Sequence, residues 1–165
     1  PGFIFIIFSF YTFYFIGSQV DKGSLFHQFY FFLILLTCVA TDIGGYVFGK
    51  IFKGPKITKI SPNKTYAGMI GGFVLSIISA SLYFDNLSFL SLSQSKGEMG
   101  AQIFFIVLSI SFISQVGDLV ISFFKRKSKI KNTGNIIPGH GGLLDRIDGM
   151  IFAFPYSFLL MKFVL

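Results

Sequence analysis

The sequence predicts an all-α membrane protein, a polytopic bundle of about five transmembrane helices that forms a single membrane-embedded domain over residues 1–165. Composition is the first observation behind this prediction: 53% of the residues are hydrophobic, 24 are phenylalanine and only 13% are charged. A soluble domain of this length would need more polar residues to cover its surface, so the apolar excess is expected to face lipid. The second observation is a series of apolar runs about as long as a bilayer is thick.

Five apolar runs are the candidate spans, because a helix needs about 18 or more residues to cross roughly 30 Å of hydrocarbon. The first, at 3–17, and the last, at 149–165, are short and lie at the ends of the chain; the others cover 26–49, 66–84 and 101–124. The chain begins without an initiator Met, a basic leader or a small-residue cleavage site, which does not fit a signal peptide. We therefore expect further spans upstream in a longer protein.

The charge pattern predicts an orientation. The formal net charge is +7, and lysine and arginine gather in the connections 50–65 and 125–148, whereas 18–25 and 85–100 are nearly neutral. Basic and neutral connections thus alternate, as a five-helix zigzag requires, and short cytoplasmic loops are enriched in lysine and arginine. Both basic connections are predicted on the cytoplasmic face. No nucleic-acid partner is expected, because the cations border apolar runs rather than cover a soluble scaffold.

Small residues within the spans favour close packing. Gly45 and Gly49 in the second run, and Gly68 and Gly72 in the third, have the GxxxG spacing that lets helix backbones approach each other. We prefer packing to a ligand role for all four. Cys38 is the single cysteine, which excludes an intrachain disulfide, and its apolar surroundings predict a small packing residue.

The fourth run carries polar residues on one helical face, because they follow one another at steps of four, three, four and three. An aspartate at the centre of a membrane helix costs roughly 2.5 to 3.5 kcal/mol, so it should face a protein or water-filled interior. We prefer a functional cavity to the alternative, a structural salt bridge between Asp118 and a neighbouring lysine. The polar residues of this face are Ser111, Gln115, Asp118, Ser122 and Lys125, with Arg126 beside them.

A second acid, Asp42, lies in the second run with Tyr46 one turn later. Two interpretations are equally good. Asp42 could line the same cavity as Asp118, or it could be a buried acid that pairs with a lysine during assembly.

The connection before the third run combines capping residues with lysines. Ser61 is expected to cap the helix and Pro62 to occupy its first turn. Lys64 and Thr65 follow at once, and a helix N-terminus surrounded by lysines can bind phosphate. The preference of cytoplasmic loops for lysine explains the same residues equally well.

The segment 138–150, PGHGGLLDRIDGM, is unusually polar for this chain. Its glycines Gly139, Gly141 and Gly142 expose backbone N–H groups and permit close approach of a phosphate chain. His140 could act as a general acid or base or orient a group by hydrogen bonding. We prefer the orienting role, because a phosphate nucleophile is already ionised near neutral pH and needs no base.

Aspartates from two parts of the chain suggest a metal site. Asp145 and Asp148 are three residues apart, on one helical face, and Asp118 comes from the fourth run. Two or three carboxylates that leave room for substrate phosphates suit Mg²⁺. With the surrounding cations, this set predicts phosphoryl or nucleotidyl transfer at a membrane surface.

These residues resemble the signature of the phosphatidate cytidylyltransferase (CDP-diacylglycerol synthase) family, which is approximately S-x-x-K-R, four residues, K-D, five residues, P-G-H-G-G-x-x-D-R-x-D. The stretches TDIGGYVFGK around Asp42, SPNKTYAG from Ser61 and Gly117-Asp118-Leu119 are also similar to family segments, so the resemblance runs from about residue 30 to the end. Three positions depart from the pattern: Asn132 replaces the Asp of the K-D pair, Gly45 an Ala, and Ala67 a longer polar residue. The matching positions are Ser122, Lys125, Arg126, Lys131, Pro138, Gly139, His140, Gly141, Gly142, Asp145, Arg146 and Asp148.

The resemblance implies condensation of CTP with phosphatidic acid to CDP-diacylglycerol and pyrophosphate, at the cytoplasmic side of a bacterial inner membrane. It implies a metal, Mg²⁺ or another divalent cation, on Asp118 and Asp145 with Asp148 as a third acid. Catalytic roles are expected for Asp118, Asp145, Lys125 and Arg126. Substrate binding is expected of Ser61, Lys64, Thr65, Ser122, Lys131, His140, Gly141, Gly142 and Arg146.

Two other functions use similar residues. A membrane anion transporter would employ half-buried cations without chemistry, and it would not need paired acids. A related CTP-dependent lipid kinase shares the chemical logic but not the long signature. A homodimer is among the partners considered for this chain.

Overall fold

The computed structural model describes residues 2–20, 25–58, 61, 64–88, 96–130 and 147–163. Regular structure in these ranges is helical, and only an isolated bridge between Lys56 and Thr65 has strand-like pairing. The all-α prediction is confirmed. The helices are α1 (Gly2–Val20), α2 (Leu25–Phe52), α3 (Tyr66–Ser88), α4 (Lys96–Lys127) and α5 (Met150–Phe163).

Three helices in the described ranges are long and apolar enough to cross a membrane: His27–Phe52, Tyr66–Asp85 and Ala101–Lys127, with mean hydropathies of 1.9, 1.8 and 2.0. Phe3–Gln19 and Met150–Lys162 are shorter apolar helices. Each apolar run of the sequence is therefore a helix, and the shorter runs at the two ends give the shorter helices. Large hydrophobic side chains cover much of the outer surface, as a lipid environment requires.

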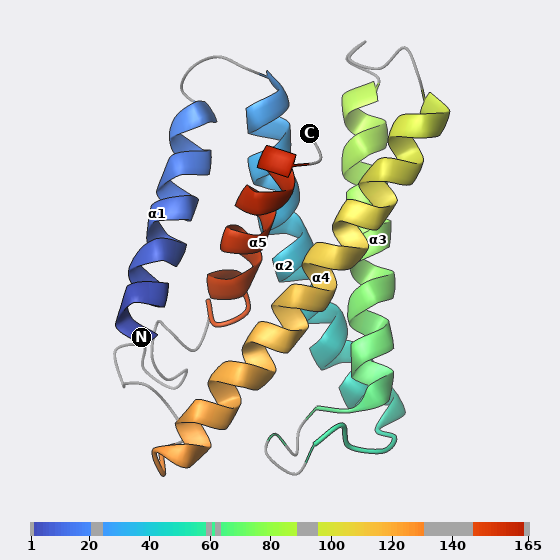
Figure 1. Cartoon of the computed structure of the whole chain (residues 1–165). Coiled ribbons are helices and arrows are strands. Elements are labelled where there is room, and N and C mark those ends of the chain that lie inside the picture. Colours follow the sequence, from blue (N-terminus) through green and yellow to red (C-terminus); the bar gives the residue numbers. More distant parts are fainter. Residues whose placement is uncertain are drawn as a thin grey trace, which may run out of the picture.

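The helices form a bundle in which α4 crosses obliquely, with α3 on one side and α1 and α5 on the other (Figure 1). The end of α2, the start of α3 and the end of α4 lie at the same end of the bundle (Figure 1). The lysines around these three helix ends thus share one side, as the alternating charge pattern predicts. A buried apolar core joins α1, α2, α4 and α5, and it includes Ile16, Ile34, Cys38, Ile110 and Phe154.

Glycines allow α2 and α3 to touch through their backbones. A Cβ atom at Gly44 would lie 2.5 Å from the carbonyl oxygen of Gly71, and one at Gly68 would lie 2.6 Å from the carbonyl oxygen of Gly45. Both distances are too short for any residue but glycine. The close packing expected of the GxxxG motifs is confirmed, and Cys38 is fully buried, as predicted for a packing residue.

A proline in α5 leaves one backbone carbonyl without its helical hydrogen-bond donor, and α1 supplies a donor. Pro155 lies inside the helix and has no N–H, so it cannot donate to the carbonyl of Ile151, four residues earlier. The Ser9 hydroxyl of α1 donates to that carbonyl oxygen at 2.7 Å, in a buried position. Because water is excluded there, this contact satisfies an oxygen that would otherwise be costly to bury.

The α2–α3 contact predicts opposite effects at adjacent glycines. Gly44→Ala should lower the free energy of unfolding by about 1 to 3 kcal/mol, because its Cβ overlaps the α3 backbone. Gly45→Ala is the control: its Cβ would lie 3.8 Å from the nearest atom, the Gly68 oxygen, so it should be neutral or stabilising by up to about 1 kcal/mol. Unfolding in detergent micelles, followed by circular dichroism, measures both. Equal losses would contradict the assigned contact.

The Ser9 contact predicts non-additive mutations. Ser9→Ala should cost about 1 kcal/mol in a protein that contains Pro155, because the Ile151 oxygen loses its donor. In a Pro155→Ala background the restored N–H satisfies that oxygen, so Ser9→Ala should cost much less. A double-mutant cycle of unfolding free energies checks this, and additive effects would show that Ser9 acts in some other way.

Candidate active site

A cavity of about 470 Å³ opens among α2, α3 and α4. Its lining combines apolar and polar side chains with several charged groups. Asp118 comes from the C-terminal third of α4, and Lys64 comes from the segment that precedes α3. The charged lining residues are Asp42, Lys64, Asp118 and Asp148.

Helix α2 contributes an acid and a fixed hydroxyl to this cavity. Asp42 and Tyr46 both line it, so the structure supports the cavity interpretation of Asp42 over the interpretation of an assembly pair. Thr41, the residue before Asp42, shares a hydrogen bond of 2.7 Å with the Ser111 hydroxyl of α4. Because both hydroxyls are buried, this bond holds the acid-bearing faces of α2 and α4 together.

The residue that caps the N-terminus of α3 is not the one that the sequence predicts. The Thr65 hydroxyl accepts a hydrogen bond from the Gly68 N–H at 3.1 Å, so Thr65 caps the helix, which begins at Tyr66. The prediction that Ser61 caps this helix was wrong. Ser61 lies in the preceding turn, where its N–H donates to the Thr58 hydroxyl at 3.3 Å. Pro62 lies outside the described residues.

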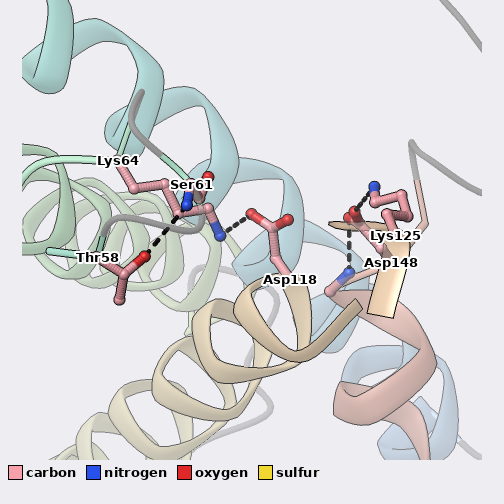
Figure 2. Close-up of polar contacts among 7 residues, drawn as sticks. Thr58, Ser61, Lys64, Asp118, Lys125 and Asp148 are labelled. Atoms are coloured by element: carbon pink, nitrogen blue, oxygen red, sulfur yellow. Dashed lines mark hydrogen bonds and ion pairs between the residues drawn. The ribbon is translucent and has the colours of Figure 1, made fainter. Parts of the chain in front are cut away.

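Backbone pairing in the α2–α3 connection positions Lys64. The Ile57 N–H donates to the Lys64 carbonyl at 2.9 Å, and the Lys64 N–H donates to the Ser61 carbonyl at 3.1 Å. With its backbone held on both sides, Lys64 directs its ammonium group to the carboxylate of Asp118, with which it forms an ion pair (Figure 2). The salt bridge that was the alternative interpretation of Asp118 is therefore present, and it lies in the cavity.

The polar face of α4 points into the bundle along most of its length. Ser111 bonds to α2, and the Gln115 side-chain amide donates to the Met69 carbonyl of α3 at 3.3 Å. Asp118 lies one turn further, at the cavity. Ser122 is half-buried and Arg126 is exposed; neither lines the cavity in the described part of the chain.

Asp148 lies just before α5 and faces α4. One of its carboxylate oxygens contacts the Lys125 ammonium at 3.3 Å, and the other accepts from the Gly149 N–H at 3.0 Å (Figure 2). A Cβ at Gly149 would lie 2.5 Å from the Ser114 hydroxyl oxygen and 3.1 Å from the Ser114 carbonyl oxygen, so the lack of a side chain lets this turn pack closely on α4. Burial and, to a smaller extent, the nearby Asp118 carboxylate together raise the pKa of Asp148 to about 7, against the lowering effect of Lys125.

Two of the three predicted metal ligands, Asp118 and Asp148, therefore lie near each other at the cavity. No group of three His, Cys, Asp or Glu side chains arranged for a metal occurs in the part of the chain that the structure describes. The third predicted ligand, Asp145, falls outside that part. So do Lys131, Asn132, Pro138, Gly139, His140, Gly141, Gly142 and Arg146.

The sequence of this chain is similar to those of known proteins. A sequence model of the cytidylyltransferase family matches residues 2–164. The chain belongs to the cytidylyltransferase family. It is 35% identical over 147 residues to the phosphatidate cytidylyltransferase of Bacillus subtilis (strain 168), covering 87% of this chain and 50% of that protein.

Two further phosphatidate cytidylyltransferases give similar matches. That of Brucella suis biovar 1 (strain 1330) is 40% identical over 121 residues, 73% of this chain and 42% of the relative. That of Staphylococcus aureus (strain COL) is 39% identical over 147 residues, 87% of this chain and 52% of the relative. The chain thus spans about half the length of the curated relatives it matches.

Sequence reasoning missed two features of the site. The Thr41 hydroxyl was not predicted to join α2 to α4, although Thr37 and Thr41 are four residues apart and share a helical face. The pairing of Lys125 with Asp148 was also not predicted. No local pattern reveals it, because 22 residues separate the two in the chain and only packing of α5 on α4 brings them together.

Proposed function

We propose that the cavity binds CTP and phosphatidic acid and forms CDP-diacylglycerol and pyrophosphate. One observation carries this proposal: in a chain of the cytidylyltransferase family, two aspartates from different segments meet at a cavity, each in an ion pair with a lysine. Carboxylates that can hold a metal ion, together with lysine side chains that can bind phosphate, suit a reaction between two negatively charged substrates.

The reaction needs little proton chemistry. An oxygen of the lipid phosphate attacks the α-phosphorus of CTP, a new P–O bond forms, and the bond from the α-phosphorus to the bridging oxygen breaks to release pyrophosphate. The attacking phosphate is ionised near neutral pH, so no general base is required. The protein must instead hold two negatively charged groups together and in line.

Asp118 and Asp148 would hold a divalent cation, Mg²⁺ in our proposal, with Asp145 as a further ligand. Two adjacent carboxylates fit that role, because Mg²⁺ is bound through one or two carboxylates together with substrate phosphates and water. Such an ion neutralises charge on the reacting phosphates.

The cations of the site would hold phosphate groups of the two substrates. Lys64 and Lys125 are within reach of the carboxylates already, and Arg126 extends the positive surface at the end of α4. Lys131 and Arg146 would add to this set, while Ser61, Thr65, Ser122, His140, Gly141 and Gly142 would contact the nucleotide or lipid phosphates.

The alternatives are less well supported. A membrane anion transporter has no use for two adjacent carboxylates, which would repel its cargo. A CTP-dependent lipid kinase would transfer the terminal phosphate of CTP and release CDP. Identification of the lipid product made from labelled CTP separates that reaction from cytidylyl transfer.

Removing either acid should abolish product formation. In the full-length protein, Asp118→Asn and Asp148→Asn should each lower the rate of CDP-diacylglycerol formation by about 100-fold or more, because the cation loses an anionic ligand. Asp85→Asn is the control, since Asp85 is near the opposite end of α3; its rate should stay within about twofold. Thin-layer chromatography of products from labelled CTP measures all three, and full activity of Asp118→Asn would refute the assignment.

The site is proposed to face the cytoplasm from a bacterial inner membrane. Ile57→Cys and Lys129→Cys, in a Cys38→Ala background, should react with a membrane-impermeant maleimide in inverted vesicles but not in intact cells. Asp85→Cys should show the reverse pattern. Labelling of residues 57 and 129 only from outside the cell would overturn the orientation.

A further inference from the structure

We propose that Lys64 and Lys125 are built-in counter-ions of the metal-free site, which release their carboxylates to a divalent cation and then bind the phosphates of the nucleotide. This inference rests on the proposed function. It assigns the two lysines alternating partners, carboxylate first and phosphate second, and thereby couples cation binding to nucleotide binding.

The two ion pairs are arranged side by side. Lys64 reaches Asp118 from the α2–α3 connection, and Lys125 reaches Asp148 from α4 itself (Figure 2). The two carboxylates are close enough to interact with each other. Each lysine therefore neutralises one carboxylate of the pair, and each ammonium group contacts a carboxylate that the proposed divalent cation would need.

The balance of charge explains why the lysines must exchange partners. Asp118 and Asp148 carry two negative charges when ionised, and the two lysines carry two positive charges. A divalent cation added to this neutral set leaves two uncompensated positive charges, and Asp42 offsets one of them. Among these five described side chains, the net charge becomes positive only after the cation binds, and a nucleotide polyphosphate then supplies negative charge.

The lysine side chain is suited to such an exchange. It is a compact charge on a flexible four-carbon stem, and it can turn from one oxygen acceptor to another without movement of the backbone. The side chains of Lys64 and Lys125 are 24% and 13% exposed. Both are thus sheltered from bulk water, while Lys64 and Asp118 also line the cavity into which a phosphate would enter.

Lysine reactivity in the unmodified full-length protein tests the exchange. An amine-acylating reagent should modify Lys64 and Lys125 slowly in EDTA, about threefold or more faster in Mg²⁺ alone, and slowly again in Mg²⁺ with a non-hydrolysable CTP analogue. Lys127, exposed at the end of α4, serves as the internal reference. Mass spectrometry of each modified peptide gives the rates. Unchanged or slower acylation of both lysines in Mg²⁺ would overturn the proposal.

Cation affinity without nucleotide is the second test. Lys64→Met and Lys125→Met should each tighten Mn²⁺ binding by about fivefold or more, because a competing ammonium is removed. Lys127→Met removes the same charge from a neighbouring position and should change the affinity by less than about twofold. Electron paramagnetic resonance of free Mn²⁺ measures binding. Equal effects in all three variants would show that the lysines act only through their general positive charge, and would refute the exchange.

The outcomes separate this inference from the proposed function. If Mg²⁺ exposes the lysines but no CDP-diacylglycerol forms, the counter-ion exchange holds and the proposed substrates are wrong. If CDP-diacylglycerol forms while Mg²⁺ leaves both lysines unreactive, the reaction holds and the exchange is wrong.

Discussion

The backbone contact between α2 and α3 is the constraint on which the candidate site depends. Where Gly44 and Gly68 meet the opposite helix, no side chain separates the two backbones. A bridge between Lys56 and Thr65 holds the connection between these helices next to Lys64, which lines the cavity. A wider separation of α2 and α3 would carry Lys64 away from Asp118. The glycines at this helix contact thus determine where the charged side chains of the site lie.

Polar groups inside this bundle are tied to one another because water is not available to them. Thr41 of α2 hydrogen-bonds to Ser111 of α4, and the Gln115 amide of α4 donates to the α3 backbone. Ser9 of α1 donates to a backbone carbonyl of α5, and the Tyr30 hydroxyl of α2 donates to the Ser157 carbonyl of α5 at 2.9 Å. Each bond joins different helices, so each fixes a relative position as well as satisfying a donor or acceptor. The two ion pairs extend the same principle to charged groups at the cavity.

The sequence predicts the helices well because the thickness of a bilayer limits them. Each apolar run became a helix, and the steps between Ser111 and Lys125 correctly predicted a face directed inward. The cap of α3 was predicted wrongly because Ser61 and Thr65 are both suitable capping residues, and only the backbone pairing of the connection decides between them. The pairing of Lys125 with Asp148 could not be predicted, because the two are 23 residues apart in the chain and the packing of Gly149 on Ser114 brings Asp148 to α4.

The turn at Gly149 also sets the depth at which Asp148 lies. It packs against Ser114, near the middle of α4, so α5 begins inside the bundle rather than at its surface. Asp118 is nine residues before the end of α4 at Lys127, or about 14 Å along the helix axis. In the proposed reaction, a lipid phosphate that reached Asp118 would keep its acyl chains in the hydrocarbon, where each buried methylene contributes about 0.8 kcal/mol. The water-soluble nucleotide would then enter the cavity from the aqueous phase, while the lipid stays in the membrane.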